Sequence, residues 1–134
     1  MIGAELRLQH PVGITISPSL LEEDVARAAS ARTDMGTGWT WYRLPPFEDN
    51  GVSVAISVGF HIGELRQVTL TDAGAQFGTS WAEWSEQRET QRAESITNWL
   101  AQRGLQPGNY NWGSISAGYD TKGGLGSASI RVAT

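Results

Sequence analysis

Acidic residues, two histidines and scattered serines are the residues of this chain whose types could support catalysis. Glu86 and Glu89 stand on neighbouring turns of a predicted helix, where two carboxylates could act as a pair. General acid–base catalysis by such a pair needs a raised pKa or a nearby base, and the sequence indicates neither. We therefore favour a water-facing helix surface for both glutamates.

The histidines and serines form no recognisable catalytic pattern. His10 and His61 have no neighbours arranged as a triad, and the serines at 80, 85, 114 and 116 do not stand in a nucleophile-elbow motif. The glycine-rich segment 123–126 lacks the spacing of a phosphate-binding loop. The chain has no cysteine, and two histidines are too few for most zinc or copper sites. We therefore predict no enzyme, no cofactor and no metal site.

Tryptophan is the residue whose abundance stands out, because it fills cores and also anchors binding surfaces. The chain has six: Trp39, Trp41, Trp81, Trp84, Trp99 and Trp112. A strand would place the first two on one face, and the predicted long helix places Trp84 and Trp99 on one face. We favour a core role for these four. Trp81 and Trp112 are expected to be partly exposed.

Hydrophobic periodicity predicts a single α+β domain over residues 1–134, with the order β-α-β-β-β-α-β-β. Strands are predicted at 12–16, 39–44, 52–60, 65–71, 110–119 and 125–132. Helices are predicted at 20–30 and 81–103, each behind a capping box that begins at Ser19 or Ser80. Gly104 is expected to end the second helix. Hairpins dominate, so we expect a largely antiparallel sheet of about six strands with both helices on one face.

Charge and length narrow the class of protein further. The chain has 134 residues, enough for one domain with its own core. Ten basic residues against fourteen acidic ones give a net charge of -4, which disfavours a nucleic-acid surface. No apolar run approaches the length that spans a bilayer, and the N-terminal residues lack the apolar region of a signal peptide. We therefore expect a cytoplasmic protein that binds no membrane.

Two segments together resemble a known group of proteins. The first contains Trp84-Ser85-Glu86, followed by Glu89, Arg92, Trp99 and Leu100. The second contains Trp112-Gly113 and Ser114-Ile115-Ser116, followed by Tyr119-Asp120-x-Lys122 and a closing Ile130. They resemble a group of small uncharacterised bacterial α+β proteins with a WSE helix and a WG…S…YD-x-K hairpin. The resemblance implies an immunity or accessory role beside a bacterial toxin or secretion component. This sequence has the glycine-rich segment 123–126 where the group usually has a serine-rich turn.

Residues and resemblance together predict a non-enzymatic protein-binding module whose partner is another protein. The predicted binding surface joins the helix start to the C-terminal hairpin, and it comprises Trp81, Glu86, Glu89, Trp112, Tyr119, Asp120 and Lys122. Two alternatives stay open. One is a small-ligand-binding protein or enzyme with a pocket between helix and sheet, lined by Trp84, Trp99, Trp112 and Tyr119. The other is a structural homodimer that forms through an exposed sheet edge or a tryptophan face.

Overall fold

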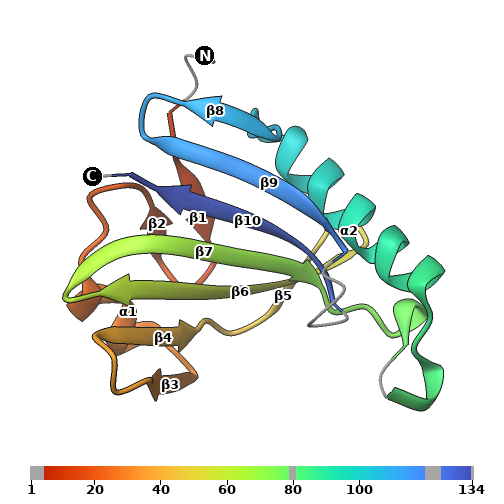
Figure 1. Cartoon of the computed structure of the whole chain (residues 1–134), viewed down its shortest axis with the longest axis horizontal. Helices are drawn as coiled ribbons and strands as arrows, with labels where there is room; N and C mark the ends of the chain where they lie inside the picture. Colours follow the sequence, from red (N-terminus) through yellow and green to blue (C-terminus); the bar gives the residue numbers. More distant parts are fainter. Residues whose placement is uncertain (1–4, 79–80, 120–124, 134) are drawn as a thin grey trace.

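The computed structural model describes residues 5–78, 81–119 and 125–133, and it describes residues 81 and 119 by their backbone alone. The described residues form an eight-stranded sheet, a two-stranded ribbon and two α-helices (Figure 1). The predicted α+β class and the largely antiparallel sheet are confirmed. The predicted number of about six strands is wrong, because several strands are too short to show an alternating pattern.

The large sheet is built from hairpins, and every pairing within it is antiparallel. Its two longest strands are β6, with 10 residues, and β7, with 9 residues, and they lie at its centre. From edge to edge, the order is β3 (Ala31–Asp34), β4 (Trp39–Arg43), β6 (Val52–His61), β7 (Glu64–Asp72), β10 (Gly126–Val132), β9 (Gly113–Tyr119) and β8 (Gly108–Tyr110). The short strand β5 (Phe47–Asp49) pairs with the start of β6.

One face of this sheet carries the hydrophobic core. The alternation of β6 turns Val54, Ile56, Val58 and Phe60 to that face, where all four are buried. The helix α2 (Glu86–Ala101), the helix α1 (Glu22–Ala28) and the ribbon of β1 (Leu8–His10) and β2 (Ile14–Ile16) join the same hydrophobic cluster. The ribbon and α1 lie behind the sheet in Figure 1. Among the described residues, no helix or second sheet covers the opposite face, which we call the open face.

The helix α1 begins without the predicted capping box. Its N-cap is Leu21, which makes no side-chain capping bond. The Oγ atom of Ser19 lies 3.1 Å from that of Ser17, and the Glu22 carboxylate accepts a hydrogen bond from the Tyr42 hydroxyl at 2.7 Å. Both members of the predicted box are thus engaged elsewhere, and the prediction is wrong here.

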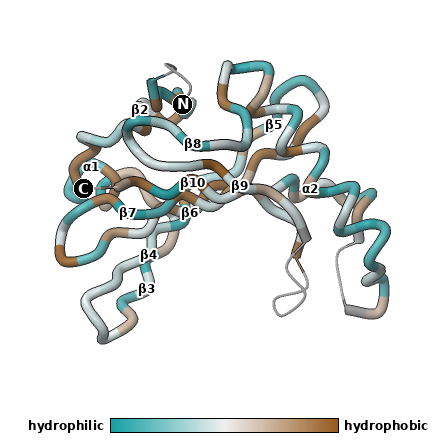
Figure 2. Tube along the Cα trace, turned by 45° about the horizontal axis from the view of Figure 1, so that its top comes forward, coloured by the Kyte–Doolittle hydropathy of each residue, from teal (hydrophilic) through white to brown (hydrophobic). Residues whose placement is uncertain are grey.

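The helix α2 begins later than predicted and ends at Ala101, two residues before the predicted end at 103. Ser85 is its N-cap and accepts the Arg88 N–H at 3.1 Å, after a separate 3-10 turn at Trp81–Glu83. The predicted cap, Ser80, lies outside the described residues. Gly104 follows the helix with a φ of 79°, a conformation that favours glycine. The helix is largely hydrophilic (Figure 2), so only its sheet-facing side joins the core.

In the part of the chain that the structure describes, no helix is both long enough and apolar enough to cross a membrane.

Candidate functional site

The structure places the loop end of the C-terminal hairpin, where β10 begins, against the first turns of α2. The Gly126 N–H donates a hydrogen bond to the Glu89 carboxylate, with an N···O distance of 2.9 Å. A Cβ atom at position 126 would lie 1.9 Å from the Glu89 carbonyl oxygen, so a side chain cannot be accommodated there. The helix start and the start of β10 are therefore direct neighbours.

Glu89 itself is buried and does not belong to an exposed surface. Its side chain forms an ion pair with Arg92 at 3.0 Å, and the residue is only 3% exposed. Arg92 also donates hydrogen bonds to the carbonyl oxygens of Asp72, Phe77 and Gly78. This buried pair fastens the chain after β7 to the helix. The expectation that Glu89 faces water is therefore wrong, and its role is structural.

The other residues of the predicted binding surface differ in their surroundings. Glu86 is exposed in the first turn of α2. Trp112 is half-buried and stacks on Tyr110, with ring centroids 4.7 Å apart. The backbone of Trp81 lies in the 3-10 turn, and that of Tyr119 ends β9. Asp120 and Lys122 lie outside the described residues.

Trp84 and Trp99 do not line a common pocket. Trp99 is a core residue, 2% exposed, as predicted. Its indole N–H donates to Asp49 at 3.1 Å, and the Arg103 guanidinium lies 3.7 Å from the ring centroid. Trp84 is 38% exposed, so the core interpretation is wrong for it. Trp84 precedes α2, whereas Trp99 lies near the end of this helix, so about 20 Å of helix separates the two tryptophans.

Trp39 and Trp41 lie on the open face of the sheet, so the core interpretation is also wrong for them. Both are half-buried, and their rings are nearly parallel, with centroids 5.9 Å apart and an interplanar angle of 11°. A Cβ atom at Gly59, on the facing strand, would lie only 2.8 Å from the Trp41 ring. The His61 ring lies 5.2 Å from that of Trp39. We call Trp39, Trp41 and His61 the aromatic ledge.

A shallow hollow adjoins the aromatic ledge. It has a volume of about 290 Å³ and is lined by Met35, Thr37, Trp39, Trp41 and Gln67. Met35 is 54% exposed, which leaves its flexible side chain accessible beside the rings. The hollow can therefore receive an apolar or aromatic side chain of a binding partner.

Two rows of residues cross the open face at the ledge. The first row is Ala31, Arg43, Ser57, Thr69, Ser129 and Ser116, and the second is Thr33, Trp41, Gly59, Gln67, Arg131 and Ser114. Arg43 and Arg131 are the only charged members of these rows, and both are exposed. Glu48 lies towards one end of the sheet, whereas Glu64 pairs with His61 of the ledge and forms an ion pair with Arg66 at 2.8 Å. The two rows therefore carry only positive charge, although the whole chain is acidic.

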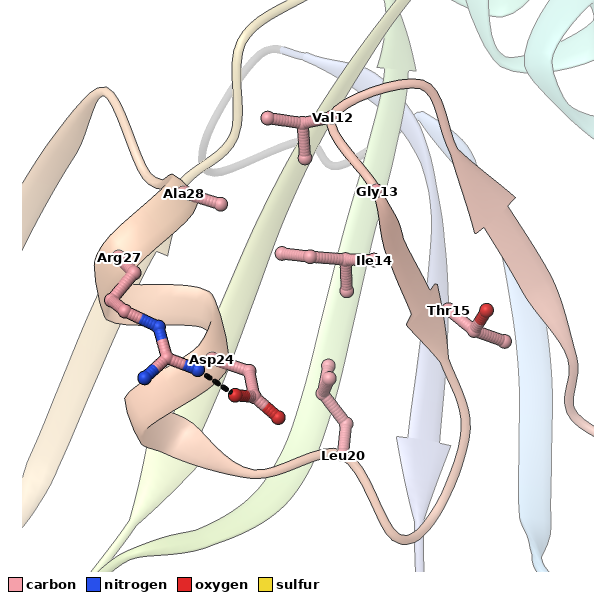
Figure 3. A pocket seen from close by; sticks show the side chains of 8 residues that line it. All are labelled: Val12, Gly13, Ile14, Thr15, Leu20, Asp24, Arg27 and Ala28. Atoms are coloured by element: carbon pink, nitrogen blue, oxygen red, sulfur yellow. Dashed lines mark hydrogen bonds and ion pairs between the residues drawn. The ribbon is translucent and has the colours of Figure 1, made fainter.

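A second hollow lies between α1 and the ribbon (Figure 3), with a volume of about 620 Å³. Val12, Ile14 and Leu20 line one side of it. Asp24 and Arg27 of α1 line the other side, and they form an ion pair with each other. Because its two charged groups already satisfy one another, this hollow offers less for polar recognition than the open face does.

His10 also has a structural role. It is buried, and its Nδ1 accepts the Val12 N–H at 3.1 Å while its Nε2 lies 3.0 Å from the Pro45 carbonyl oxygen. Burial lowers the pKa of His10, and the bond to Pro45 offsets part of that change. Among the described residues, no group of three or more histidine and acidic side chains could hold a metal ion.

Comparison with known proteins found no relative of this chain. No protein-family model matches the chain, and neither a curated protein nor a solved structure matches it.

Proposed function

We propose that this chain is a non-enzymatic protein-binding module that binds its partner through the open face of the sheet, at the aromatic ledge. The observation that carries the proposal is the near-parallel, half-exposed pair of Trp39 and Trp41 beside a hollow. Tryptophan is enriched among the residues that dominate binding energy at interfaces. The Trp41 ring packs directly on Gly59, so its motion is restricted before binding. Less conformational entropy is therefore lost when a partner docks.

The charge of the open face supports a partner segment of defined chemistry. Arg43 lies one row from Trp41, and Arg131 lies three strand spacings away, or about 14 Å. An apolar or aromatic side chain flanked by carboxylates would complement the ledge and both arginines, and opposite charges would speed the encounter. The proposed source of this acidic segment is a bacterial toxin or secretion component, the partner class that the resemblance implies.

The test is affinity capture of the tagged chain from its native lysate, with three variants beside the wild type. Trp41→Ala removes the ledge, Arg131→Glu reverses the charge across the face, and Trp84→Ala is the matched control, an exposed tryptophan just before α2. We expect the wild type and the control to retain the same partner. Each open-face variant should lose it by at least about tenfold, the scale of a truncated interface anchor.

Circular dichroism must first show that all the variants are folded. A partner that both open-face variants retain would contradict the proposal. So would a wild-type chain that enriches no protein from the lysate, and so would a cross-linked partner segment that carries no carboxylates.

A further inference from the structure

The sheet has a free edge at β3. Strand β3 is the last in the sheet order, pairs with β4 on one side, and has all four of its residues exposed. An edge strand presents backbone N–H and C=O groups that can pair with another chain. Its residues therefore decide what can be added to this edge.

The hydrogen bonds of the β3–β4 hairpin show which backbone groups point outward. The Met35 N–H donates to the Trp39 carbonyl oxygen at 3.0 Å. Bonded pairs alternate with non-bonded ones along an antiparallel ladder, so Thr33 also directs its backbone groups towards β4, at Trp41. Arg32 and Asp34 consequently point their backbone groups away from the sheet. The two outward residues of this edge carry opposite charges.

Two copies of β3 could pair edge to edge about a two-fold axis. Their outward residues would then have to lie opposite one another. Within β3, three antiparallel registers achieve this. Two of them set Arg32 against Arg32 or Asp34 against Asp34, and like charges directly opposite are destabilising. The third register centres Thr33 on the axis and sets Arg32 of each copy against Asp34 of the other. Both pairs then exchange their backbone hydrogen bonds and match their charges.

We propose that this chain forms a symmetric dimer in which two β3 edges pair in the third register. The Arg32 and Asp34 side chains are 56% and 58% exposed and form a long ion pair of 3.7 Å within one chain, which dimerisation would exchange for two ion pairs between the copies. A four-residue edge forms only a small interface, and dimerisation is therefore reversible and rises with concentration. The partner at this edge is a second copy of the chain.

The dimer also has a consequence for the aromatic ledge. Trp41 lies opposite Thr33, one strand from the edge. Pairing of two β3 strands would therefore bring the two Trp41 residues to within three strand spacings, about 14 Å, on the same open face. The two ledges would form one continuous surface. This inference rests on β3 alone and does not require the proposed protein-binding function.

Sedimentation velocity at increasing protein concentration measures dimerisation, and variants that reverse the charges of Arg32 and Asp34 test the proposed register. The wild type should shift from monomer to dimer, whereas Arg32→Asp and Asp34→Arg should each remain monomeric. Mixed in equal amounts, these two variants should form a heterodimer, because every cross-strand pair then joins opposite charges. The double variant Arg32→Asp/Asp34→Arg should dimerise again. Arg27→Asp, an exposed charge reversal on α1, should behave as the wild type.

A wild type that stays monomeric at all concentrations would overturn the inference. A dimer that survives both single reversals would also overturn it, and so would a mixture of the two single variants that fails to associate. Circular dichroism of each variant separates loss of pairing from loss of folding. None of these outcomes depends on capture of a partner, so the dimer and the proposed function can fail separately.

Discussion

Gly59 shows how one residue can create a binding feature. The alternating pattern of 52–60 predicts a strand, and the small residues on its polar side leave room on the second face. In the structure the Trp41 ring occupies the space that a side chain at position 59 would take. The tryptophan is thereby held close to the sheet, and its remaining surface is available to a partner.

His10 should make stability depend on pH. Its Nδ1 accepts a hydrogen bond from Val12, so the folded state holds the ring neutral and the pKa of His10 is lowered. A group of this kind stabilises the fold fully above the unfolded pKa of 6.5, and this contribution is lost as the pH falls through the folded pKa. We expect the free energy of unfolding to decrease on acidification below about pH 6.5, by at most about 1.4 kcal/mol per pH unit from this group.

Urea unfolding of the wild type and of His10→Gln at a series of pH values measures this contribution. The variant should be less stable near neutral pH, and its stability should vary less with pH below about 6.5. Parallel pH profiles for the two proteins would contradict the assignment.

At the scale of elements, the buried pair of Glu89 and Arg92 holds α2, the chain after β7 and the start of β10 together. Glu89→Ala should cost about 3–5 kcal/mol, because it leaves the Arg92 guanidinium buried without its carboxylate. Glu86→Ala, one turn earlier and exposed, should change stability by less than about 0.5 kcal/mol. Denaturant unfolding compares the two variants, and equal effects would show that Glu89 does not serve as a clamp.

The long elements could be predicted from the sequence, whereas most of the short strands, β2 apart, could not. Strands β4, β6 and β7 lie within one or two residues of their predicted bounds, since each shows aromatic or alternating apolar residues. The strands β1, β3 and β8 have three or four residues, which is too few to display a period. The first capping box failed because Glu22 bonds the Tyr42 hydroxyl from another element, a tertiary contact that local spacing does not reveal.

The candidate site was harder to predict, because distant residues determine it. Glu89 is buried by its contact with Gly126, which lies 37 positions away in the sequence. The spacing of Trp39 and Trp41 correctly places both on one face of a strand. Whether that face is the core or the open one depends on pairing with β6, where Gly59 rather than a large residue stands opposite Trp41.

At the scale of the whole molecule, the two faces of the sheet differ in their charges and in the elements that cover them. The helices and the ribbon close one face of the sheet, and the acidic first turn of α1 lies on that side. The open face carries Arg43, Arg131 and the aromatic ledge, so two rows of this face are positive although the net charge of the chain is -4. An acidic partner would therefore be oriented towards the open face as it approaches. Raising the salt concentration should slow its association.

Site-specific photo-cross-linking in native cells would locate the partner on the surface of this chain. A photoreactive amino acid replaces Thr69 in the middle of the open face or, in a matched chain, the exposed Glu94 of α2. The proposed function predicts that position 69 cross-links to a partner protein and that position 94 does not. Cross-linking from position 94 alone would place the partner on the helix side and contradict the assignment of the open face.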